Sequence, residues 1–120
     1  MLNCSSFDHF VQELNPSIVL FDRFMSEEQF GWRVAENCPD ALRILDTEDL
    51  HCLRLARQKA VKENREFREA DLFSDTAKRE IASIYRSDCT LMIATEEITI
   101  LQQQFKIDSS VAIISVQSIR

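Results

Sequence analysis

The sequence predicts an α/β fold, a Rossmann-like three-layer αβα unit with a mostly parallel sheet of about four strands. Short, continuous apolar runs alternate along the chain with longer segments of helical periodicity. Such runs are typical of strands buried on both faces, as in parallel sheets. The segments between them are long enough to form crossover helices, so we expect helices on both faces of the sheet. The length of 120 residues fits one domain.

Each expected strand is an apolar run that ends near a polar residue: residues 17–21, 41–45, 89–94 and 111–116. Each expected helix has apolar residues three and four positions apart and starts at a capping or acidic residue. The expected helices are residues 5–14, one from Ser26 to the proline at 39, a long one opened by Thr47, one from Ser74 or Asp75, and one capped by Thr95.

Composition argues against several classes of function. The net charge of -6 argues against a nucleic-acid partner, since binding to phosphates depends on clustered Lys and Arg. The basic residues between 54 and 68 are interleaved with glutamates, so we interpret them as a solvated helix face. Gly31 is the only glycine, so neither a dinucleotide fingerprint nor a Walker loop is encoded.

Four cysteines without Cys-x-x-Cys spacing indicate free thiols, with Cys52 and Cys89 packed in apolar segments, and a reducing cytoplasmic location. No His, Cys and Asp cluster has zinc-ligand spacing, so no metal site is predicted. No apolar run approaches the length of a transmembrane segment.

Polar residues follow three of the four expected strands. Asp22 and Arg23 follow the first, a stretch from Asp46 to His51 follows the second, and Thr95 opens the segment after the third. Ligands of open parallel sheets bind beyond the carboxyl ends of the strands. We therefore expect these side chains to lie within reach of one another at one edge of the sheet.

Two interpretations of these residues stay open. Asp46, Glu48 and Asp49 are explained by helix capping with no function. Alternatively, Asp49 orients or polarises His51, whose near-neutral pKa suits proton abstraction from a hydroxyl nucleophile. A further set of side chains is suited either to binding a phosphate or carboxylate or to pairing with neighbouring acids: Arg23, Arg33 and Arg54.

Two stretches, SIVLFDR at 17–23 and EEQFGWRVAENCPDALRILDTEDLHCLRLARQ at 27–58, resemble bacterial glycosyltransferases of the GT-B type, in particular the family 4-like group. The later stretch DCTLMIATEEITILQQQFKID at 88–108 is similar to that family too. The resemblance implies transfer of a sugar from a nucleotide-sugar donor to an acceptor hydroxyl. It implies catalytic roles for His51 and Asp49, and acceptor-side binding by Arg23, Asp46, Glu48 and Thr95.

Family members normally begin with a strand and a glycine-rich loop, whereas this sequence opens with a helix. We therefore expect residues 1–120 to form one partial domain, the acceptor-side half of such an enzyme, inactive alone. The donor would bind to a missing C-terminal glycosyltransferase domain or a homologous subunit, and this chain would bind no cofactor itself.

Two other classes of function remain as alternatives. A noncatalytic Rossmann-like interaction module would bind a partner through an exposed sheet edge. A receiver-like signalling domain would use strand-end carboxylates such as Asp22 and Asp46, but it needs a lysine after the last strand, and Gln117 to Arg120 contain none.

Overall fold

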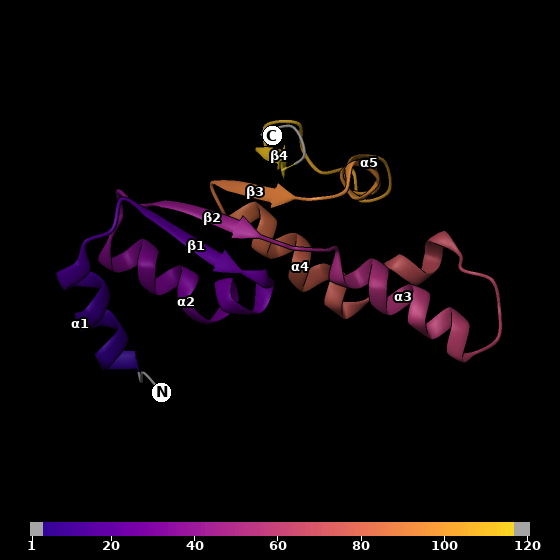
Figure 1. Cartoon of the computed structure of the whole chain (residues 1–120), viewed down its shortest axis with the longest axis horizontal. Coiled ribbons are helices and arrows are strands. Elements are labelled where there is room, and N and C mark those ends of the chain that lie inside the picture. Colours follow the sequence, from indigo (N-terminus) through magenta and orange to yellow (C-terminus); the bar gives the residue numbers. More distant parts are fainter. Residues whose placement is uncertain (1–3, 117–120) are drawn as a thin grey trace.

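A computed structural model describes residues 4–116 of the chain (Figure 1). Four parallel strands and five α-helices make up this part of the molecule. In chain order the elements are α1 (Cys4–Leu14), β1 (Ile18–Asp22), α2 (Arg23–Asn37), β2 (Leu42–Asp46), α3 (His51–Lys62), the 3-10 helix η1 (Glu69–Leu72), α4 (Asp75–Arg86), β3 (Cys89–Met92), α5 (Thr95–Gln103) and β4 (Ile113–Ser115).

The strands follow one another across the sheet in the order β1-β2-β3-β4, and all three neighbouring pairs are parallel. The predicted α/β class with a parallel sheet of four strands and about five helices is confirmed. Because each strand lies beside its predecessor, right-handed crossovers place the connecting helices on the same side of the sheet. In Figure 1 the arrows of β1, β2 and β3 point toward the side of the molecule that holds α3, and β4 runs parallel to β3.

One face of the sheet is packed against the helices. Phe21, Leu45 and Met92 point from β1, β2 and β3 into a single core cluster, and all three are buried. Helices α2, α3, α4 and α5 contribute buried side chains to the same cluster: Val34, Leu53, Ile84 and Leu101. Helix α1 packs on α2, with the rings of Phe7 and Phe30 centred 4.6 Å apart.

The opposite face of the sheet is solvent-exposed over the described residues. Ile18 and Leu20 alternate with the inward-facing residues of β1 and are 60% and 56% exposed. The expectation that this strand is buried on both faces is therefore wrong. We call this surface the open face. Its aliphatic members are Ile18, Leu20, Leu42, Ile44, Leu91 and Ile114, and the register places Asp22, Asp46 and Cys89 on the same face.

Helix α3 begins four residues later than predicted. Thr47 is buried and its hydroxyl donates to the Leu91 carbonyl at 3.0 Å, so this side chain joins β2 to β3 and caps no helix. The first amides of α3 are instead capped from distant elements. Glu80 on α4 accepts hydrogen bonds from the His51 and Cys52 amides at 2.7 and 2.9 Å. A carboxylate at this position also complements the helix dipole.

A second buried carboxylate joins α2 to α4. Glu27 is 2% exposed and pairs with Arg86 at 2.6 Å, and its other contact is the Ser83 hydroxyl at 2.7 Å. Gly31, one turn later on α2, leaves the space that this carboxylate occupies, because a methyl group there would overlap with the Glu27 carboxylate. The single glycine of the sequence thus permits close packing of a buried ion pair.

The other observed helix boundaries lie closer to the predicted ones. The Ser74 hydroxyl accepts a hydrogen bond from the Ala77 amide, which confirms it as the cap of α4. Thr95 is the first residue of α5 and makes no capping bond, so that prediction is wrong. Helix α2 starts at Arg23 and not at Ser26, because Phe24 and Glu27 already pack into the interior in the first turn. The 3-10 helix η1 was not predicted.

We predict that Glu80→Gln lowers the free energy of unfolding by about 1–3 kcal/mol, because a neutral amide offers one acceptor oxygen to two buried amide donors. Urea denaturation of this variant beside Glu36→Gln, an exposed glutamate of α2, checks the prediction. Equal stability of the two variants would contradict it.

We expect the stabilities of Glu80→Gln and Glu36→Gln to depend differently on pH. Burial raises the pKa of Glu80 above its ordinary value of 4.5, although its hydrogen bonds to the Cys52 and His51 amides oppose the shift. The folded state therefore binds this proton more tightly than the unfolded state. Stability should fall as the pH rises from 4.5 toward the raised pKa, and Glu80→Gln should lack this component.

Candidate functional site

Charged side chains from β1 and β2 meet at the carboxyl edge of the sheet. Asp22 and Asp46 are register partners in the parallel pair. Carboxylate oxygens of Asp22, Asp46 and Glu48 lie within 4.8 Å of one another. Arg23 pairs with Glu48 at 2.9 Å. The structure thus brings together four of the residues that the sequence indicated, and we call them the edge cluster: Asp22, Arg23, Asp46 and Glu48.

The loop after β2 positions Glu48 toward this cluster. An Asp46 carboxylate oxygen accepts a hydrogen bond from the Glu48 amide at 3.1 Å, and Glu48 itself has a positive φ of 59°. Asp46 therefore serves as a local turn residue and as a cluster member. The turn directs the Glu48 side chain back to Arg23, which is 25 residues earlier in the chain.

The carboxylates of the edge cluster differ in how readily they bind a proton. Hydrogen bonding to Arg23 lowers the pKa of Glu48, whereas the hydrogen bond with Glu48 raises the pKa of Asp22. The group thus combines one firmly ionised carboxylate with one that holds its proton more readily. Three close carboxylates can in principle hold a divalent cation. The Arg23 guanidinium already supplies a positive charge to this group, so the arrangement is an ion-pair network.

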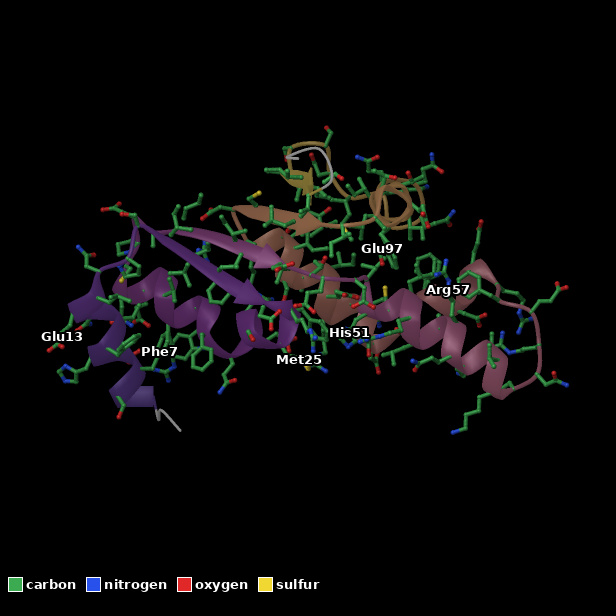
Figure 2. The ribbon with its side chains drawn as sticks, in the orientation of Figure 1. Phe7, Glu13, Met25, His51, Arg57 and Glu97 are labelled. Carbon is green, nitrogen blue, oxygen red and sulfur yellow. The ribbon has the colours of Figure 1, made fainter. Side chains whose placement is uncertain are left out.

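His51 lies at the first position of α3, next to the edge cluster in sequence. Figure 2 labels it on the side of the molecule where β1 and β2 end. Its Nε2 contacts the Arg54 guanidinium at 2.5 Å, and its ring meets the Phe24 ring edge to face at 5.6 Å. The Nδ1 atom is buried and has no hydrogen-bond partner among residues 4–116.

Arg54 lies between His51 and Asp49 in the network of contacts. Asp49 pairs with Arg54 at 3.4 Å, and Arg54 in turn contacts His51. Asp49 affects the His51 imidazole in two ways, through its ion pair with the Arg54 guanidinium and through its own negative charge. Burial and then the positive charge of Arg54 lower the pKa of His51 below its ordinary value of 6.5. The imidazole is therefore neutral at neutral pH, as a proton acceptor must be.

The three arginines singled out in the sequence all pair with acids. Arg23 pairs with Glu48, Arg33 with Asp8 at 2.9 Å, and Arg54 with Asp49. Of the two interpretations of these arginines, the structure therefore shows pairing with neighbouring acids. Arg33 lies on α2 and contacts α1, away from the carboxyl edge.

Thr95 is exposed at the start of α5, after β3. Within residues 4–116 no hydrogen bond joins Thr95 to the edge cluster. The neighbouring residue Glu97 connects α5 to the residue before α3, because its carboxylate accepts a hydrogen bond from the Leu50 amide at 2.6 Å. Sequence reasoning missed the connecting roles of Glu97 and Glu80. A signal existed for Glu80, because it occupies the apolar side of α4 between Ala77 and Ile84.

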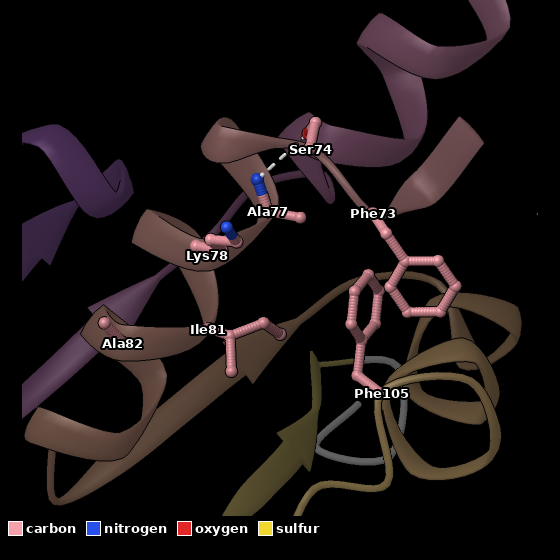
Figure 3. Close-up of a pocket in the computed structure, with 7 residues that line it drawn as sticks. All are labelled: Phe73, Ser74, Ala77, Lys78, Ile81, Ala82 and Phe105. Atoms are coloured by element: carbon pink, nitrogen blue, oxygen red, sulfur yellow. Dashed lines mark hydrogen bonds between the residues drawn. The ribbon is translucent and has the colours of Figure 1, made fainter. Parts of the chain in front are cut away.

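The apolar pocket shown in Figure 3 is lined by residues other than the candidate site residues described above. Its volume is about 370 Å³, and its walls come from α4, the two residues before α4 and one residue just after α5: Phe73, Ser74, Ala77, Lys78, Ile81, Ala82 and Phe105. The Phe73 and Phe105 rings meet edge to face, 5.2 Å apart. None of the predicted site residues contributes to it.

Comparison of the chain with protein-family models, with curated proteins and with solved structures finds no match. Among the described residues, no helix has the length and apolar character needed to cross a membrane.

We predict that the His51 ring titrates with a midpoint below 6.5 and that Arg54→Gln raises this midpoint by removing a nearby positive charge. NMR titration of the ring protons measures both values. Arg57→Gln, one turn further along α3, is the matched control and should leave the midpoint unchanged.

An unchanged midpoint in Arg54→Gln would contradict the contact between the two side chains. Because the unfolded chain binds the His51 proton more tightly, this group should also contribute stability that is complete above pH 6.5 and is lost as the pH falls through the lowered pKa.

Proposed function

We propose that this chain is the acceptor-side part of a glycosyltransferase that moves a sugar from a nucleotide-sugar donor to an acceptor hydroxyl. The observation that supports this proposal best is the edge cluster beside a histidine that is neutral at neutral pH. Both lie at the carboxyl ends of parallel strands, where ligands of such sheets bind.

The edge cluster is suited to a polyhydroxylated acceptor. Asp22, Asp46 and Glu48 offer carboxylate oxygens that accept hydrogen bonds from hydroxyls, and Arg23 offers donors. Asp22 and Arg23 are exposed, so a ligand can reach them. Thr95 adds an exposed hydroxyl on α5 to the same proposed surface.

His51 is the proposed general base. The acceptor oxygen attacks the anomeric carbon of the donor, the bond to the nucleoside diphosphate breaks, and the hydroxyl proton passes to Nε2. This atom contacts Arg54, so the guanidinium must turn away when the acceptor binds. Asp49 pairs with Arg54 and stabilises the positive charge that then forms on the imidazole.

Donor binding is assigned to a partner. We propose that a C-terminal glycosyltransferase domain, or a homologous subunit, holds the nucleotide sugar, since residues 1–120 contain one glycine and no phosphate-binding loop. The complete assembly would then work in the cytoplasm.

We predict that simple sugars bind weakly to the isolated chain at the edge cluster. In a ¹⁵N-labelled sample titrated with glucose or glycerol, we expect amide shifts confined to residues 22–24 and 46–51. Asp46→Asn should weaken binding, and Asp40→Asn, an exposed acid beyond the opposite ends of the strands, is the control. Shifts elsewhere, or none, would contradict an acceptor surface here.

We predict that His51→Ala lowers kcat of the assembled enzyme by about 100-fold or more, the usual range for loss of a general base. The assay joins this chain to its donor-binding domain and measures transfer to the acceptor. His9→Ala removes the other histidine, which is exposed on α1, and should leave kcat unchanged. An unchanged kcat in His51→Ala would exclude the proposed base.

A further inference from the structure

The contact between His51 and Arg54 determines which ring nitrogen of the histidine carries a proton. The Nη2 atom of Arg54 lies 2.5 Å from the Nε2 atom of His51. A guanidinium carries only N–H donors, has no acceptor and stays protonated in proteins. The Nε2 atom must therefore be the acceptor in this contact, and an accepting ring nitrogen carries no proton.

The other states of the ring do not fit the same contact. In the imidazolium form both nitrogens are donors, so two cations would meet with N–H facing N–H. The neutral form with the proton on Nε2 has the same clash of donors. A ring rotated by 180° about its Cβ–Cγ bond would present a carbon to Arg54, and a carbon accepts no hydrogen bond.

The remaining proton of the neutral ring lies on Nδ1, where the surroundings do not favour it. This atom is buried and has no hydrogen-bond partner among residues 4–116. The Phe24 ring packs edge to face with the imidazole and supplies no oxygen or nitrogen. A buried N–H without a partner is costly, whereas Nε2 lies on the exposed side, where an N–H could donate to water. The contact with Arg54 is what opposes this preference.

Asp49 keeps the guanidinium in this place. Its carboxylate lies 3.4 Å from the Nε atom of Arg54, whereas His51 contacts the Nη2 atom. The two contacts use different nitrogens, so one guanidinium makes both at once. A hydrogen bond from a charged donor is stronger than one between neutral groups, and it therefore outweighs the loss at Nδ1.

We propose that Arg54 is a positioning residue that holds the neutral His51 ring in the tautomer protonated on Nδ1. The lone pair of Nε2 then stays free of a proton on the exposed side of the ring. The tautomer follows from the contact alone, and its value for proton transfer rests on the proposed function. When the guanidinium moves aside, Nε2 can accept the proton of an acceptor hydroxyl without a prior exchange of protons within the ring.

NMR of the isolated chain with ¹⁵N-labelled histidine tests the proposal, because an N–H nitrogen and an unprotonated ring nitrogen resonate at well-separated frequencies. At about pH 8 the ring is neutral, since the pKa of His51 lies below 6.5. We expect Nε2 of His51 to be unprotonated and Nδ1 to carry the proton. Arg54→Met should raise the ratio of the Nε2-protonated to the Nδ1-protonated tautomer at least about tenfold, the factor that a charged hydrogen bond contributes.

Arg57→Met is the matched control, because Arg57 is also an exposed arginine of α3, and this variant should keep the wild-type tautomer. A wild-type ring protonated on Nε2 overturns the proposal, and this result stands even if a variant does not fold. An unchanged tautomer in folded Arg54→Met, or an equal change in Arg57→Met, overturns the role of Arg54. The measurement needs no donor or acceptor, so a failure of the proposed sugar transfer would be seen separately, in the kcat of His51→Ala.

Discussion

The sequential order of the strands across the sheet explains where the helices and the core of this protein lie. Because β1, β2, β3 and β4 follow one another across the sheet, the crossover helices gather on one side. That arrangement produces a single core cluster between the sheet and α2 to α5. It also produces two features of the molecular surface. Polar residues collect at the carboxyl edge, and a largely aliphatic face stays open.

Buried carboxylates connect the helices of this one-sided layer. Glu80 caps the start of α3 from α4, and Glu27 joins α2 to α4 through Arg86 and Ser83. A buried carboxylate is costly unless it is hydrogen-bonded, and both oxygens of Glu80 and of Glu27 accept hydrogen bonds. Glu80 thereby places His51 at the first turn of α3, within contact of Arg54 and Phe24. The packing of the helices and the chemistry of the proposed site are linked through this contact.

The proposed site consists of a network of ion pairs at the protein surface. Arg23 and Glu48 neutralise each other at the surface, and Arg54 connects Asp49 to His51. Exposed pairs of this kind contribute little to stability, so they can rearrange when a ligand with hydroxyl groups binds. A pocket with apolar walls exists elsewhere, at α4 and α5, and does not include these side chains.

The fold class, the approximate positions of four strands and five helices, and the proximity of Asp22, Arg23, Asp46 and Glu48 could be predicted from the amino-acid sequence. They follow from hydrophobic periodicity and from the rule that parallel strands end at one edge of a sheet. The hydrogen bond from Thr47 to β3 and the capping of α3 by Glu80 could not be predicted in this way, since both partners come from distant segments of the chain. Only the tertiary structure shows that Ile18 and Leu20 face solvent. An apolar run has the same sequence whether one or both faces of the strand are buried. Which faces are buried depends on the order of the strands in the sheet.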